Sequence, residues 1–143
     1  MKLRIYKETT VRVPRARLER LFRAVARGER RKAGEVNLVF TGGRRMRRLN
    51  RTYRGRDKAT DVLAFPLHEG AGEQADEIYG EVYIAVPVAR AQAAAYGVGL
   101  GEEILRLACH GWLHLFGYDH HTPAEAAAMR TREERYLAAV RGA

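Results

Sequence analysis

Hydrophobic and polar positions alternate along several short segments of this chain and follow a helical period along others. Residues 1–6 alternate apolar and charged side chains, the pattern of a strand with one buried face. Three further short apolar runs are bounded by glycine or proline, which predicts three more strands. These strands are expected at Val36–Phe40, Asp61–Phe65 and Ile78–Val86.

Five segments place apolar residues three and four positions apart, which is typical of amphipathic helices. The first begins at Pro14 and ends near Gly28. The last begins at a capping box, Thr122 to Glu125, with proline at the first helical position. The five helices are expected over 14–28, Arg44–Tyr53, 87–96, 102–116 and 123–140. The acidic, glycine-containing stretch 67–77 is expected to be a surface loop.

The order of these elements predicts an α+β fold, with a small mixed four-stranded sheet covered by about five helices. At 143 residues the chain can bury a real hydrophobic core. The sequence contains no internal repeat and no segment with the composition of a linker. One domain over residues 1–143 is therefore expected.

The formal net charge is +9, and most of the positive charge is arginine. Such a field attracts polyanions and makes nucleic acid the first partner to consider. An arginine- and alanine-rich composition also arises in GC-rich genomes and in heat-adapted proteins. Charge alone therefore favours RNA binding without establishing it.

Several features favour a cytoplasmic protein. The start, Met1 to Ile5, has no apolar run long enough for a signal peptide, and no stretch reaches the length of a membrane span. The single cysteine, Cys109, excludes a disulfide within the chain and fits a reducing compartment. We expect a soluble protein with no membrane partner.

Four of the five histidines lie between residues 110 and 121. On a helix, His110 and His114 project from one face about one turn apart, a separation that suits two imidazoles binding one metal ion. Gly117 can end the helix in a left-handed conformation, after which the chain can offer His120 as a third ligand. Three nitrogen ligands leave one position open, which is typical of a catalytic zinc site.

The spacing of these histidines matches that of the metzincin metalloproteases, with one departure. Those enzymes use a glutamate directly after the first histidine as general base, and this chain has Gly111 there. His121 stands beside His120 and is an alternative third ligand, although the metzincin spacing selects His120. Asp119 could orient a histidine or simply form the turn.

A second informative stretch runs from Leu49 to Pro66 and begins in an arginine-rich helix. The planar fork of arginine binds phosphate oxygens in pairs and positions a nucleic acid without reading its sequence. Arg51, Arg54 and Arg56 are the candidate nucleic-acid-binding residues. A solvated charged face is sufficient to explain the earlier arginines of this helix, at positions 44, 45, 47 and 48.

The phrase from Asn50 to Pro66, together with His110 to His120, closely resembles the YbeY family of bacterial rRNA maturation factors. The resemblance runs from about residue 35 to the end of the chain. Ala59 departs from it, where a proline is common, and so does Ala64, where a serine is common.

The resemblance implies a single-strand-specific endoribonuclease that binds one zinc ion and acts in late 16S rRNA 3′-end maturation and ribosome quality control. It implies that His110, His114 and His120 bind the metal in a zincin-like site, and that Arg54 and His114 serve catalysis. The implied partners are the 16S rRNA precursor and the ribosome or its proteins, and the oligomeric state is left open.

Two other functions remain open at this stage. A metallopeptidase or amidase is favoured by the histidine spacing and opposed by Gly111. A non-catalytic RNA- or ribosome-binding protein would use the metal only to hold its last helices in place.

Overall fold

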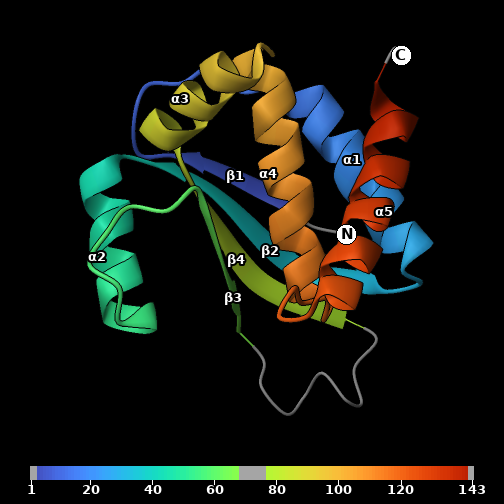
Figure 1. The fold of residues 1–143 in the computed structure, drawn as a ribbon. Helices are drawn as coiled ribbons and strands as arrows, with labels where there is room; N and C mark the ends of the chain where they lie inside the picture. Colours follow the sequence, from blue (N-terminus) through green and yellow to red (C-terminus); the bar gives the residue numbers. More distant parts are fainter. Residues whose placement is uncertain (1–2, 68–76, 142–143) are drawn as a thin grey trace.

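The computed structural model of the chain describes residues 3–67 and 77–141. The loop predicted over 67–77 lies, apart from its two ends, outside the described residues. The described residues form four strands and five helices, in the order that the hydrophobic pattern predicts (Figure 1). The strands are β1 (Leu3–Lys7), β2 (Lys32–Thr41), β3 (Val62–Pro66) and β4 (Glu77–Ala85). The helices are α1 (Arg15–Gly28), α2 (Gly43–Arg54), α3 (Val86–Tyr96), α4 (Leu100–Leu115) and α5 (Pro123–Val140).

The four strands form one mixed sheet in the order β1-β2-β4-β3. Strand β2 runs parallel to both β1 and β4, whereas β3 runs antiparallel to β4 and lies at the edge of the sheet. The predicted mixed four-stranded sheet is thereby confirmed. Within the described ranges β3 pairs with β4 alone, so the edge strand of the sheet comes before its neighbour β4 in the sequence.

Helices α1, α4 and α5 lie on one side of the sheet, and α2 lies on the other (Figure 1). The main core fills the space between the sheet and helices α1, α4 and α5. Its largest fully buried side chains are Trp112, Phe22 and Phe40. A smaller apolar cluster packs α2 against the opposite face through Met46 and Tyr83. No helix within the described ranges is long and apolar enough to cross a lipid bilayer.

Strand β2 is longer than the apolar run Val36–Phe40 that predicted it. Its pairing with β4 begins at Lys32, passes a register shift between Ala33 and Glu35, and then continues to Thr41. A β-carbon on Gly34 would overlap the ring of Tyr79 on β4. The first residues of β2, before Val36, thus belong to the strand because their backbone pairs with β4. They do not form an apolar run, so the hydrophobic pattern did not predict them.

Candidate metal centre

Helix α4 carries His110 and His114 on one side, and the segment after α4 brings His120 to them. The ring centroid of His114 lies 4.8 Å from that of His110 and 4.9 Å from that of His120. The rings of His110 and His120 are 5.5 Å apart. One nitrogen from each ring lies within 4.8 Å of the other two, so this cluster could hold one metal ion. The structure thus brings together the three histidines that the spacing selects.

Gly117 makes the sharp turn that ends α4. Its φ angle is +104°, a conformation that L side chains rarely adopt. Two backbone hydrogen bonds close the turn: the N–H of Gly117 donates to the carbonyl of His114, and that of Tyr118 donates to the carbonyl of Leu113, both at 3.0 Å. This pair of bonds is the Schellman motif. It sends the chain back past the end of α4, which is how His120 reaches the other two histidines.

Tyr118 anchors the segment between His114 and His120 to the rest of the protein. Its hydroxyl donates to Oε1 of Glu29, just after α1, at 2.8 Å. Glu29 also accepts a hydrogen bond from the hydroxyl of Tyr136 and lies 3.5 Å from Nη1 of Arg132, both on α5. Burial and the neighbouring Glu29 carboxylate raise the pKa of Tyr118, so the hydroxyl keeps its proton at neutral pH. One carboxylate thereby joins α1, α5 and the turn.

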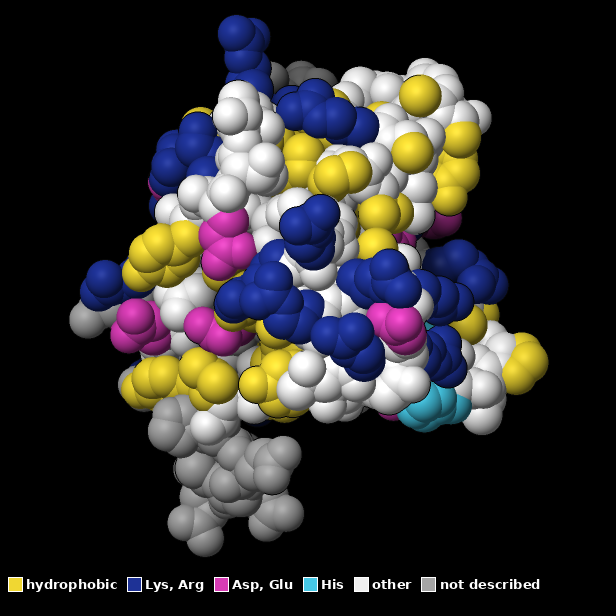
Figure 2. Space-filling view, turned by 90° about the vertical axis from the view of Figure 1, so that its left-hand side faces the viewer, with side chains coloured by type: hydrophobic (Ala, Val, Ile, Leu, Met, Phe, Trp, Pro, Cys, Tyr) yellow, Lys and Arg dark blue, Asp and Glu magenta, His cyan; other side chains and the backbone are white. Residues whose placement is uncertain are grey.

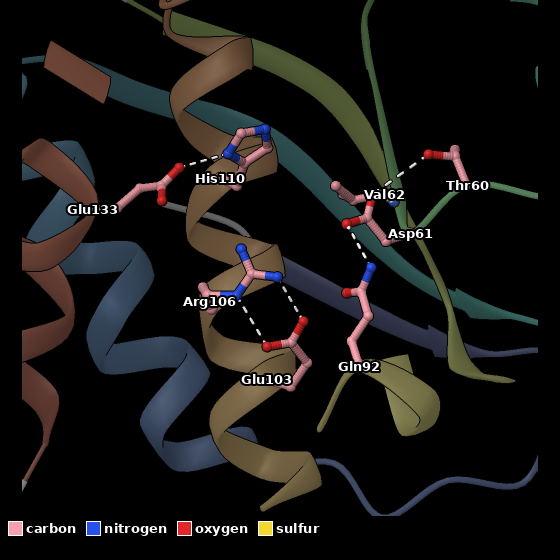
Figure 3. A network of polar contacts seen from close by, with 8 residues as sticks. All are labelled: Thr60, Asp61, Val62, Gln92, Glu103, Arg106, His110 and Glu133. Atoms are coloured by element: carbon pink, nitrogen blue, oxygen red, sulfur yellow. Dashed lines mark hydrogen bonds and ion pairs between the residues drawn. The ribbon is translucent and has the colours of Figure 1, made fainter. Parts of the chain in front are cut away.

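Glu133 contacts the ring of His110. Its Oε1 lies 2.5 Å from Nδ1 of His110, and Figure 3 shows the two side chains pointing toward each other from α5 and α4. A carboxylate oxygen accepts, so Nδ1 carries the proton and Nε2 is left free as a metal ligand. Glu133 is buried. A carboxylate that holds the other nitrogen of a ligating histidine is a recurrent feature of zinc sites.

A second buried carboxylate lies on α4 itself. Glu103 is 1% exposed, and Arg106 binds it with two nitrogens at 2.9 Å and 2.6 Å (Figure 3). Because both oxygens are paired, this charge is compensated within the helix. Glu103 therefore does not serve the cluster, and Glu133 is the carboxylate that contacts the ring of His110.

His114 has a pKa well below that of a free histidine side chain. Burial lowers its pKa to about 4, and the neighbouring His110 and His120 act in the same direction. At neutral pH the ring is therefore uncharged and has a nitrogen lone pair available. Neutral imidazole is the form that binds metal ions.

Gly111 faces the sheet rather than the cluster. A β-carbon at this position would lie 2.5 Å from Cγ1 of Val82 on β4 and 3.3 Å from Cγ2 of Val62 on β3. Position 111 therefore needs glycine for α4 to approach the sheet this closely. There is no room in this packing for the glutamate that a metzincin carries at this position.

His121 and Asp119 form a pair of their own. Nε2 of His121 lies 2.9 Å from Oδ2 of Asp119, and the side chain of His121 is 80% exposed. The other oxygen of Asp119 accepts the backbone N–H of His120 at 2.8 Å, which is the main reason that its pKa is lowered. Asp119 thus shapes the turn: it contacts the backbone of His120 and the ring of His121, and it makes no hydrogen bond to the ring of His120.

The histidine cluster opens into a cleft of about 740 Å³ that lies along the edge strand β3. One part of its lining, the basic wall, is formed by Arg54, Arg56 and Lys58, and another part by the three clustered histidines. Nη2 of Arg54 lies 3.4 Å from the carbonyl oxygen of Ala64 on β3. Arg54 and Arg56 are exposed, so both guanidinium groups can meet a ligand in the cleft.

The basic wall is held in place by α2. The carboxylate of Asp57 accepts two hydrogen bonds from Arg47, at 2.9 Å and 3.0 Å. Nδ2 of the buried Asn50 donates to the carbonyl of Lys58 at 2.9 Å. Gly55, with φ +70°, ends the helix and starts this loop. Arg51 does not line the cleft; its Nη1 lies 3.7 Å from Asp57.

Among the residues that the structure describes, two carboxylates line the cleft, and both have partners. Oδ1 of Asp61 accepts the backbone N–H of Val62 at 2.8 Å, and Oδ2 accepts a hydrogen bond from Gln92 at 3.3 Å (Figure 3). Asp119 is occupied by the two neighbouring histidines, as described above. The lining thus offers cations and imidazoles to a ligand, which suits an anion.

Sequence reasoning did not identify Glu133 or Glu29. A pattern for Glu133 was present, because it occupies an apolar-face position of α5, four residues after Met129 and four before Leu137. A charge at such a position needs a buried partner. Glu29 follows the end of α1 and carries no comparable pattern. Cys109, Trp112 and Phe116, which lie next to the histidines in the sequence, are all buried in the core.

The fold and the site together define an α+β protein with a zincin-like three-histidine cluster beside a basic cleft. A family model described as "Endoribonuclease YbeY" matches residues 4–141. The chain therefore belongs to this family, and the match extends to β1, beyond the residues on which the resemblance was first based.

Curated relatives and a solved structure support this membership. An "Endoribonuclease YbeY" of Chlorobaculum parvum is 36% identical over 143 residues, which cover 100% of this chain and 98% of the relative. The "Endoribonuclease YbeY" of Moorella thermoacetica is 48% identical over 113 residues, which cover 74% of this chain and 72% of the relative. The solution structure of a Thermotoga maritima protein matches with a TM-score of 0.66 and 29% identity. The match covers 98% of this chain and 89% of the Thermotoga maritima chain.

Proposed function

We propose that this protein is a metal-dependent endoribonuclease that hydrolyses phosphodiester bonds in single-stranded RNA. The observation that carries the proposal is the placement of Arg54 and the three clustered histidines on the walls of one cleft. Its membership of a family whose relatives are called endoribonucleases supports the same reaction. One domain over residues 1–143 would perform this reaction in the cytoplasm.

In this proposal His110, His114 and His120 hold one zinc ion. Three neutral imidazoles fit zinc, and the Glu133 contact and the low pKa of His114 favour the protonation states that ligation requires. A bound zinc ion would supply a Lewis acid for the scissile phosphate. His114, whose pKa is lowered by burial, would then serve catalysis as a ligand.

Arg54 is proposed to bind the same phosphate, because it lines the same cleft as the histidines. A guanidinium group can give two parallel hydrogen bonds to phosphate oxygens and stabilise the negative charge that develops there. Arg56 would bind a neighbouring phosphate in the cleft, and Arg51 would do so at its rim. The described part of the cleft presents no unpaired carboxylate to act as general base, so the attacking group would not depend on one.

A peptidase or amidase is the alternative that the histidine spacing favours. Gly111 opposes it, because the residue that a metzincin uses as a base would here point into the strands β3 and β4. The basic cleft wall also favours a polyanion over a peptide. A purely structural role for the metal is a further alternative, and it predicts folding that depends on the metal.

The test combines metal analysis with cleavage of a single-stranded RNA oligonucleotide. We expect one zinc ion per native chain, loss of metal and cleavage in His114→Ala, and retained metal with cleavage about 10²–10³-fold slower in Arg54→Ala. Cleavage at the native rate by chelated protein or by His114→Ala would overturn the proposal. Turnover of a peptide library without turnover of RNA would favour the peptidase instead.

The biological substrate proposed is the 3′ end of the 16S rRNA precursor, in maturation and in ribosome quality control. This part rests on the family resemblance. Its test is to compare cleavage of a precursor 3′-end transcript with cleavage of a scrambled transcript of equal length, with and without ribosomal subunits. Equal rates on both transcripts under both conditions would contradict a role at this site.

A further inference from the structure

Helix α2 has an unusual composition. Six of its twelve residues are arginine, and none is acidic. Successive residues are rotated by about 100° around a helix, so Arg44, Arg48 and Arg51 lie along one side of α2. This side is opposite the buried Met46 and the partly buried Leu49, and all three arginines are exposed. We call these three residues the arginine stripe.

The arginines of α2 differ in whether they have partners. Arg47 is bound by both oxygens of Asp57, and Arg45 hydrogen-bonds the side chain of Tyr83. For Arg44 and Arg48, in contrast, no ion pair or side-chain hydrogen bond is found among the described residues. Like charges one turn apart repel each other in a helix. This arrangement is unfavourable for folding alone and suits a surface that meets an anion.

The arginine stripe is continuous with the cleft. Arg51 lies one turn before Arg54, which lines the cleft beside the histidines. From residue 44 to residue 54 the helix rises about 15 Å, a span that can follow a few successive phosphates. Figure 2 looks onto this side of the molecule: Lys and Arg side chains gather in its centre, and a histidine side chain is visible at the margin of this basic area.

We propose that the arginine stripe binds the phosphates of the RNA strand outside the cleft. The inference rests on the proposed endoribonuclease function and extends its binding site beyond the scissile phosphate. Arginine groups along a surface bind a nucleic-acid backbone without regard to sequence. RNA is favoured over an acidic protein because the stripe runs directly into the cleft wall formed by Arg54 and Arg56.

The test variant is the double substitution Arg44→Gln, Arg48→Gln, which leaves the cleft lining unchanged. The matched control is Arg20→Gln, Arg23→Gln, which removes the same charge from exposed positions of α1 on the other side of the sheet. Glutamine has nearly the helix propensity of arginine, so both variants should fold. Binding is measured with metal-free protein and two single-stranded RNAs, of about 4 and about 12 nucleotides, the range of known single-strand sites.

We expect the stripe variant to bind the longer RNA several-fold more weakly than the native protein. The slope of log affinity against log salt concentration is negative, and its magnitude should fall by about 1.4 for two lost phosphate contacts. The loss should be confined to the longer RNA, and the control variant should bind both RNAs as the native protein does.

A role of the arginine stripe in RNA binding is excluded if the variant binds the longer RNA with native affinity. It is equally excluded if the α1 control loses as much affinity as the stripe variant. It is also excluded if only binding of polyglutamate falls, since this would identify an acidic protein as the partner. Failure of the endoribonuclease proposal is distinguishable, because the native metal-loaded protein would then leave the short RNA uncut.

Discussion

Gly111 and Val82 are in such close contact that a β-carbon on Gly111 would lie 2.5 Å from Cγ1 of Val82. This contact sets how closely α4 approaches the sheet and therefore where His110 and His114 stand relative to the edge strand β3. It also explains why the position that is a glutamate in metzincins is a glycine here. The residue has a packing role that a catalytic side chain would prevent.

We predict that Gly111→Ala destabilises the protein by up to about 2 kcal/mol. Overpacking a tight core contact costs about 1–3 kcal/mol, and the gain in helix propensity offsets about 1 kcal/mol of this cost. Urea denaturation of the metal-free protein measures the effect. The control is Gly101→Ala in the same helix, where the nearest atom is the flexible end of Arg17 at 3.1 Å, so stability should be unchanged or slightly higher. A Gly111→Ala variant as stable as the native protein would show that the helix can move away.

Glu133→Gln should weaken metal binding by about 10–100-fold, because loss of a carboxylate that orients a ligating histidine has this effect in other zinc sites. The measurement is competition with a chelator, together with the melting temperature of the metal-free protein. Glu134→Gln is the control, since Glu134 is the exposed neighbour on the same helix. Native metal affinity in Glu133→Gln would mean that the contact with His110 has no bearing on the metal.

Alanine substitution of the two neighbouring histidines after α4 should have different effects on metal binding. His120→Ala should lose metal, because its ring completes the cluster. His121→Ala should keep it, because that side chain is 80% exposed and pairs with Asp119. Metal content after dialysis measures both. The reverse result would assign the third ligand to His121 and require the turn to rearrange when metal binds.

Cys109 should be protected from thiol reagents in the native state. It is fully buried, and burial, together with the nearby Glu133 and Glu29, raises the pKa of its thiol. Labelling at pH 8 should therefore follow the rate of unfolding and become fast in urea. Since the thiol ionises at lower pH when unfolded, this group's contribution to stability is present below about pH 9 and is lost as the pH rises further.

The control for the pH effect is Cys109→Ala, which should lack this decline while other groups keep theirs. Fast labelling of the native protein at pH 8 would contradict the burial of the thiol. It would also indicate that α4 opens locally near the histidine cluster, since Cys109 directly precedes His110.

The sequence alone determined the elements and the local part of the site. Alternating and helical periodicities depend on which face of each segment is buried, so they predicted the four strands and five helices. Four-residue spacing placed His110 and His114 on one side of a helix, and Gly117 predicted the turn that returns His120. These features depend on contacts a few residues apart, which spacing encodes directly.

The tertiary structure decided what spacing does not encode. The strand order β1-β2-β4-β3 depends on pairing between segments far apart in the sequence. The contact of Glu133 with His110 and that of Gly111 with Val82 join different elements. Arg54 and the histidines belong to different helices, and the fold places them on one cleft along the edge strand β3. Such contacts follow from how the amphipathic faces pack together, which the pattern of each element by itself leaves open.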